Sequence, residues 1–224
     1  MMEGSNAKRG QRSRRRRGGR PTKAEAALVE DRLLAIAAEL FARDGYAATS
    51  VERVASMCGA GKDTIYRRYA SKRALFNAVL ERSRKRIMAR LDDLGAGSAE
   101  QDSLAQLREL TSCLLDINLD PELIAFKRIA LSEMLIADSD RVGPEADAIS
   151  DLLRAGVVQA QKDRHLVAAD ATFLTNHLIN SIIVGPTTLA MFGYKPLPPA
   201  DRKAYFKKAW KLFLGGAAAT GSSD

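Results

Sequence analysis

Cysteine, histidine and aromatic residues are scarce in this sequence. It has two cysteines and two histidines among 224 residues. Cys58 and Cys113 have neither metal-ligand spacing nor the density of a disulfide framework. His165 and His177 have no neighbouring cluster of other metal ligands. These absences predict no metal, no cofactor and a reducing, cytoplasmic setting.

Long apolar runs and catalytic motifs are absent as well. No apolar run reaches the roughly 18 residues needed to cross a bilayer, and none follows the basic N-terminus as in a secretory signal. The stretch 59–64 looks like the end of a phosphate-binding loop, but the preceding glycine and strand are missing. The sequence shows neither the residue order of a Ser-His-Asp catalytic triad nor a pair of carboxylates suited to acid–base catalysis. The sequence therefore predicts neither a membrane protein nor an enzyme.

Positive charge is concentrated in the first third of the chain. Residues 1–20 contain eight basic residues and one acid, and residues 21–90 contain fourteen and eight. Residues 91–224 contain thirteen basic and eighteen acidic residues, within an overall net charge of +8. Because the N-terminal third is basic and the rest of the chain is acidic, we expect only the N-terminal part to bind a polyanion.

The first 20 residues form an arm with almost nothing apolar to pack, and we expect it to be disordered. Its arginines include Arg14, Arg15, Arg16, Arg17 and Arg20. Three interpretations are open. The arm enters the minor groove beside a recognition helix, adds sequence-independent affinity through counterion release, or stays solvated without function. We favour counterion release.

Helical periodicity dominates the following residues. Apolar side chains recur at helical spacing from about Lys23 to Arg43, and Gly45 is expected to end this helix. Thr49 and Glu52 have the spacing of a capping box, which predicts that a second helix begins at Thr49.

A short third helix is expected from about Lys62 to Tyr69, after a tight turn at Gly59. Ile65 and Tyr69 are one turn apart and should face the core. The side chains left to face outward are those of Lys62, Asp63, Thr64, Tyr66, Arg67 and Arg68. This arrangement is typical of a helix-turn-helix, whose second helix enters the DNA major groove.

The outward side chains near the start of this third helix suit base recognition. Lys62 and Arg67 can donate to guanine, and the methyl group of Thr64 can contact a thymine methyl. Asp63 can accept from a cytosine amino group, or it only stabilises the helix dipole.

Residues 49–75, preceded by Gly-Arg-Pro-Thr at 19–22, resemble the DNA-binding domain of the TetR (tetracycline-repressor) family. The matching positions are Thr49, Ser50, Val51, Val54, Ala55, Gly59, Thr64, Ile65, Tyr66, Tyr69, Lys72 and Leu75. The similarity covers roughly residues 20–80. One departure is Gly61, where the family has a serine cap. This costs only a few tenths of a kcal/mol but removes a possible phosphate contact.

The resemblance implies further roles. Ser50, Tyr66 and Lys72 match family positions that anchor the DNA backbone, and Arg68 is placed to assist them. With Thr49, they complete the predicted DNA-contacting set. Tyr66 has an alternative as a core aromatic, but Ile65 and Tyr69 already occupy the inward face.

The rest of the chain also has helical patterns, so the predicted fold is all-α with about nine helices. We expect a helix-turn-helix domain over 21–70, a helical ligand-binding and dimerisation domain over 71–216, and a tail over 217–224. A long apolar helix should run from about 169 to 192 with an interruption at Gly185-Pro186. The C-terminal region resembles the corresponding domain of TetR-family regulators and is faintly similar to the AefR-like subgroup.

Two apolar stripes suggest a homodimer interface, with an internal core as the alternative. They consist of Leu174, Leu178 and Ile182 on one helix and Phe206, Trp210 and Phe213 on the last helix. A twofold dimer requires a near-palindromic operator.

The family resemblance also implies a cavity for a small, mostly apolar effector. Its candidate lining residues are Thr111, Phe126, Met134, Asn176, His177 and Asn180. The function expected is a homodimeric, ligand-released transcriptional repressor, and the alternative is an architectural DNA-binding protein without an inducer.

Overall fold

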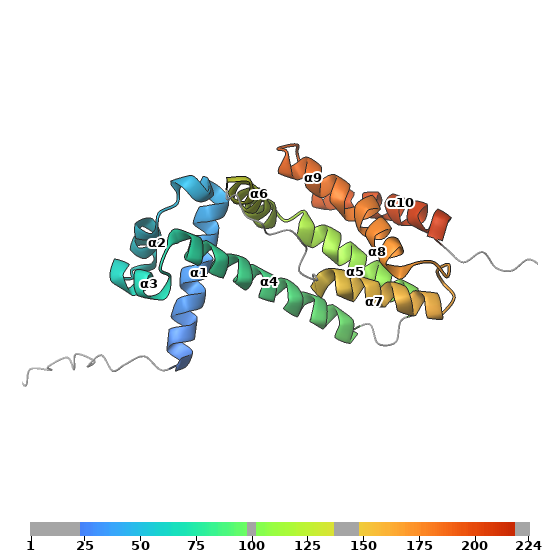
Figure 1. Cartoon of the computed structure of the whole chain (residues 1–224), viewed down its shortest axis with the longest axis horizontal. Coiled ribbons are helices and arrows are strands. Elements are labelled where there is room, and N and C mark those ends of the chain that lie inside the picture. Colours follow the sequence, from blue (N-terminus) through green and yellow to red (C-terminus); the bar gives the residue numbers. More distant parts are fainter. Residues whose placement is uncertain (1–22, 98–101, 137–147, 218–224) are drawn as a thin grey trace, which may run out of the picture.

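The computed structural model describes residues 23–97, 102–136 and 148–217, so the predicted basic arm lies outside the described part (Figure 1). The described residues form ten α-helices, one π-helical segment and no β-strand. Their bounds are α1 (Lys23–Ala48), α2 (Val51–Cys58), α3 (Lys62–Arg68), α4 (Lys72–Gly97), α5 (Ser103–Asn118), α6 (Pro121–Ile136), α7 (Ala148–Lys162), α8 (Ala171–Ile179), η1 (Asn180–Val184), α9 (Gly185–Met191) and α10 (Pro199–Ala217). The segments α8, η1 and α9 are continuous, so the predicted all-α fold of about nine helices is confirmed. None of these described helices combines the length and apolarity that a bilayer crossing requires.

Short polar caps set several helix starts. The Asp102 carboxylate accepts from the Ala105 amide at 2.7 Å, and the Asp170 carboxylate accepts from the Phe173 amide at 2.7 Å. Asp120 caps α6 in the same way, as its Asp-Pro sequence predicts. The Ser71 hydroxyl oxygen accepts from the Ala74 amide at 3.1 Å and so caps the start of α4.

The first hydrophobic core joins α1, α2 and α3 to the first half of α4. It also takes in two residues from much later in the sequence, Phe126 and Ile129 of α6. The Phe126 ring meets Phe76 edge-on at 6.1 Å between centroids, and Phe76 meets Phe41 at 5.1 Å. Edge-on packing suits the quadrupoles of aromatic rings. Helix α6 is therefore part of the packing that holds the N-terminal helices.

The second core fills the space between α5, α7, α8, η1 and α10. It encloses all six residues predicted to form the dimer interface, namely Leu174, Leu178, Ile182, Phe206, Trp210 and Phe213, each at most 6% exposed. That prediction is wrong. The two stripes pack together within one chain, so the alternative interpretation, an internal core, is the correct one. The reason is that α10 runs alongside α8.

Helix α4 runs from one core into the other (Figure 1). Leu75 and Val79 are buried in the first core, and Leu91 is buried in the second. Arg82 lies between these anchors and makes two hydrogen bonds, of 2.7 and 3.2 Å, to the Asp31 carboxylate of α1. The N-terminal helices are thus attached to the rest of the chain through both α4 and α6.

The predicted interruption of the long apolar helix appears as a π-helical segment. Pro186 has no amide hydrogen, so it cannot donate to the carbonyl of Ile182 four residues earlier. The hydroxyl of Tyr205 on α10 donates to that carbonyl at 3.1 Å. The widened turn thereby gains a hydrogen bond from a neighbouring helix.

Candidate nucleic-acid interface

The turn between α2 and α3 is built on glycine. Gly59 ends α2 with φ 65° and ψ 24°, a left-handed conformation that glycine adopts at little cost. The amide of Ala60 donates to Ala55 O at 3.0 Å and the amide of Gly59 to Ser56 O at 3.2 Å. Gly61 then begins α3 without a side-chain cap. These bonds fix the angle at which α3 leaves α2.

The start of α2 differs from the prediction by one residue. Ser50, not Thr49, is the N-cap, and its Oγ accepts from the Arg53 amide at 3.1 Å. Thr49 is only 1% exposed, and its hydroxyl donates to Gly45 O at 2.8 Å. Gly45 has φ 81° and kinks the end of α1, which brings its carbonyl within reach of Thr49. Thr49 is therefore a buried link between helices, and its prediction as a DNA contact is wrong.

Helix α3 has the two faces that its sequence predicts. Ile65 is fully buried and Tyr69 is 8% exposed. The outward residues Lys62, Asp63, Thr64, Tyr66, Arg67 and Arg68 are all exposed, as is Ser50 at the start of α2. The side chains predicted to contact bases thus lie on one open helix surface.

Lys62 and Tyr66 both bind the Glu52 carboxylate of α2. Lys62 Nζ lies 2.7 Å from Glu52 Oε1, and the Tyr66 hydroxyl donates to the same oxygen at 3.2 Å. The Lys62 ammonium, with help from the backbone of Glu52 itself, lowers the pKa of Glu52 to about 2. Glu52 in turn raises the pKa of Lys62. Glu52 was missed as a site residue because its spacing to Thr49 suggested a capping role.

Arg68, a predicted backbone contact, and the inward residue Tyr69 are both held by α1. Arg68 Nη2 lies 2.6 Å from Glu30 Oε2, and the Tyr69 hydroxyl donates to Glu30 Oε1 at 2.9 Å. Burial, followed by the bond to Glu30, raises the pKa of Tyr69 to about 12. These contacts fix the C-terminal end of α3 against α1.

Lys72 caps the end of α1. Its ammonium donates to Ala47 O at 3.1 Å and lies 4.4 Å from the centre of the Tyr46 ring. A cation at a helix C-terminus is favourable because the last carbonyls carry partial negative charge. By contrast, within the described residues Arg67 forms no salt bridge and is exposed in the last turn of α3.

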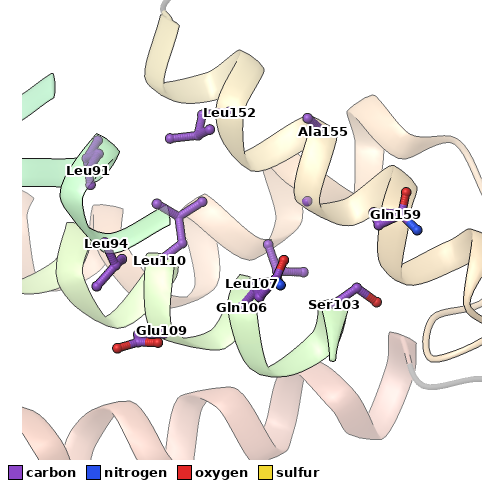
Figure 2. Close-up of a pocket in the computed structure, with 11 residues that line it drawn as sticks. Leu91, Leu94, Ser103, Gln106, Leu107, Glu109, Leu110, Leu152, Ala155 and Gln159 are labelled. Carbon is purple, nitrogen blue, oxygen red and sulfur yellow. The ribbon is translucent and has the colours of Figure 1, made fainter. Parts of the chain in front are cut away.

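Two of the cavities in the C-terminal part of the chain lie between its packed helices. The first, of about 280 Å³, lies between the end of α4, α5 and α7 (Figure 2). Leu91, Leu107 and Leu152 give it an apolar wall, and Glu109 lies at one side. The second, of about 300 Å³, lies between α5, α6, α7 and the rod formed by η1 and α9.

The residues predicted to bind an effector do not line either of these cavities. Thr111 is buried with its hydroxyl donating to Leu107 O, and Phe126 belongs to the first core. Asn176, His177 and Asn180 are exposed. Met134 lies beyond the residues whose side chains are described. The prediction that these residues line one cavity is therefore wrong, because some of them are buried among the helices and others lie on the surface.

Residues 33–79 match the family model of bacterial regulatory proteins of the tetR family. This match assigns residues 33–79 to the N-terminal domain of the TetR family. TetR-family proteins are DNA-binding regulators rather than enzymes. A DNA-binding transcriptional repressor TetR of Mycobacteroides abscessus is 45% identical over 49 residues, which are 22% of this chain and 26% of that relative. The chain thus matches about a quarter of the relative's length.

Solved structures of transcriptional regulators share the fold over most of the chain. A TetR-family transcriptional regulator of Mesorhizobium loti MAFF303099 has a TM-score of 0.67 at 21% identity, covering 88% of this chain and 100% of its own. A transcriptional regulator of Saccharomonospora viridis in complex with choline has a TM-score of 0.68 at 17% identity, covering 87% and 100%. At such identities the likeness establishes the fold alone.

Proposed function

We propose that this chain is a homodimeric, cytoplasmic transcriptional repressor that binds a near-palindromic operator through α3 and is released by a small, mostly apolar molecule. The observation that carries the proposal is the exposed face of α3. Lys62, Thr64 and Arg67 project from it, while Ile65 and the Gly59 turn fix the helix from below. Such a helix presents donors and a methyl group to base edges.

The dimer face proposed here replaces the buried stripes. On α8 and its continuation, Phe173, His177 and Val184 are exposed along one side. On α10, Leu212 is 80% exposed and shares a flank with Ala209. The bond from Tyr205 to Ile182 O holds the two helices together. In the proposed dimer, two copies of this surface pack as a four-helix junction across a twofold axis.

A DNA-binding measurement on the full chain tests the proposal. Genomic fragments retained by the purified protein should share a near-palindrome, and footprinting should show one protected stretch on each. Lys62→Ala and Arg67→Ala should each weaken operator binding by about 1–3 kcal/mol. Lys162→Ala, an exposed change at the end of α7, is the matched control.

Two results would reject this proposal. Uniform retention of unrelated fragments would favour an architectural DNA-binding protein, in which the basic arm supplies most of the affinity. Undiminished operator binding by both α3 variants would remove α3 from the interface.

A further inference from the structure

A groove between α5 and α10 has a basic lining. It measures about 620 Å³, and its walls include Arg108 of α5 together with Lys203 and Lys207 of α10. Glu109 is the acid among the described lining residues. Three cations beside one carboxylate leave this set of residues with an excess of positive charge, which favours an anionic ligand.

The positive charge is particular to α10 and is not shared by the surrounding sequence. Residues 199–217 contain five basic residues and one acid, whereas residues 91–224 as a whole contain thirteen and eighteen. Helix α10 lies at the opposite end of the molecule from α3 (Figure 1). The lysines of α10 are therefore remote from any duplex that α3 contacts, and recognition of DNA by α3 does not account for them.

The cations of the groove are not paired with acids of the chain. Within the described residues, Arg108, Lys203 and Lys207 form no salt bridge, whereas the neighbouring Arg202 places Nη1 3.5 Å from Asp116 Oδ1. Lys203 and Lys207 are exposed and lie one turn apart on the same face of α10. Their ammonium groups are thus available to a ligand in the groove.

An aromatic ring positions Arg108. The guanidinium carbon lies 5.9 Å from the centre of the Phe206 ring, and Phe206 is only 5% exposed. The face of an aromatic ring attracts a cation, so this contact holds the Arg108 head at the groove. Because the ring has no oxygen acceptor, the guanidinium keeps its N–H donors for a ligand.

These groups suit a ligand with closely spaced phosphates. A guanidinium binds two phosphate oxygens at once, and a lysine ammonium binds phosphate as a point charge. Ser112, which also lines the groove, adds a hydroxyl donor. A single carboxylate would engage only part of this set, whereas linked phosphates present several charges together. The volume of the groove is within the range of small-molecule sites, roughly 300–1,000 Å³.

We infer that this groove binds a small molecule with two or three linked phosphate groups, and that Arg108, Lys203 and Lys207 hold those phosphates. The groove is a different site from the exposed face of α3. The inference therefore goes beyond the proposed function and does not depend on it.

The fluorescence of Trp210 reports on the groove. Trp210 is the one tryptophan in the sequence, and its ring centre lies 5.8 Å from that of Phe206. The full chain is titrated with orthophosphate, pyrophosphate and tripolyphosphate at constant ionic strength and without DNA. Tripolyphosphate should change the fluorescence saturably and bind roughly 10-fold more tightly than orthophosphate, because it makes more charge-assisted hydrogen bonds.

Variants that remove one charge locate the phosphates. Lys203→Gln, Lys207→Gln and Arg108→Gln should each weaken tripolyphosphate binding by roughly 5- to 10-fold. Lys208→Gln removes the same charge from an exposed residue on another side of α10, so it is the matched control and should behave as the parent. The two lysine variants change only exposed side chains, so they decide the result even if Arg108→Gln fails to fold.

Several outcomes overturn the inference. Tripolyphosphate binding detected by calorimetry without a change in Trp210 fluorescence would place the ion elsewhere, such as on the basic arm. Equal weakening by Lys207→Gln and Lys208→Gln would show diffuse attraction rather than a site. Equal affinity for orthophosphate and tripolyphosphate, or no binding, would exclude recognition of linked phosphates. A stronger Trp210 response to random duplex DNA than to tripolyphosphate would assign the groove to a nucleic-acid backbone instead.

Discussion

The Glu52 carboxylate lies 2.7 Å from the Lys62 ammonium, at the first residue of α3. A negative charge at this point withholds Lys62 from phosphates, and the pKa of Glu52, lowered to about 2 by Lys62, keeps that charge at any ordinary pH. Glu52→Gln should therefore increase affinity for random duplex DNA. The slope of log K against log salt should steepen by about 0.9, the value for one additional phosphate contact.

Fluorescence anisotropy over a salt series measures this slope. Glu39→Gln is the matched control, since Glu39 is an exposed acid of α1 that lies 3.7 Å from Arg43 and borders a groove with Pro121 at the start of α6. An unchanged slope for Glu52→Gln would show that Lys62 contacts no phosphate once it is released.

The basic arm should add sequence-independent affinity. Deletion of residues 1–18 removes seven basic residues and one acid, so the same salt plot should become flatter for random and operator DNA alike. A slope equal to that of the full chain would mean that the arm does not contact DNA. A loss confined to operator DNA would favour reading of the minor groove instead.

The exposed flank of α8 and α10 should control the oligomeric state. Leu212→Glu places a charge at a position that is 80% exposed in one chain, so it should not disturb folding but should oppose burial in an interface. Sedimentation velocity should show monomers for this variant and dimers for the parent. Leu131→Glu, at an exposed position of α6, should remain dimeric. A dimeric Leu212→Glu would place the interface elsewhere.

The raised pKa of Tyr69 should appear in the pH dependence of stability. The folded chain holds the phenol proton more tightly than the unfolded chain, with a pKa of about 12 against about 10 for an ordinary tyrosine. Its contribution is complete below about pH 10 and is lost as the pH rises towards 12. The free energy of unfolding should therefore fall by roughly 2 kcal/mol over that interval because of Tyr69.

Urea unfolding at several pH values, compared with Tyr69→Phe, isolates this effect. The variant should be less stable by ~1 kcal/mol at neutral pH, because it lacks the bond to Glu30, and the difference should shrink above pH 10. Tyr194→Phe, at a residue 65% exposed, should run parallel to the parent. If the stability of Tyr69→Phe has the same pH dependence as that of the parent, the pKa of the Tyr69 phenol does not change on folding.

Local sequence rules were sufficient for the helix-turn-helix. The Gly59 turn and the inward pair Ile65 and Tyr69 follow from chain conformation and helical period alone, and the structure confirms both. The choice between Thr49 and Ser50 as cap was not predictable in this way. Both carry a hydroxyl, and the outcome depends on how Gly45 bends the end of α1.

Long-range packing could not be predicted from periodicity. A stripe such as Leu174 to Ile182 shows which side of a helix is buried, but not whether the same chain or a second copy covers it. The place of Phe126 beneath the N-terminal helices, and the pairing of Glu52 with Lys62, depend on crossing angles between helices. Those angles depend on the packing of the whole core, so they cannot be read from the sequence pattern of any one helix.

Helix α4 anchors Leu75 in one core and Leu91 in the other without a break. An α-helix is stiff, so α4 moves as one rigid body, and a small rotation at one end gives a larger displacement at the other. Lys72 and Leu91 are separated by ~28 Å along the helix axis, so a rotation of about 5° around Leu91 displaces Lys72 by roughly 2–3 Å. That displacement is comparable with the length of a hydrogen bond, so a small rotation of α4 beside the cavity of Figure 2 would shift its opposite end by an amount that can break or form such a bond.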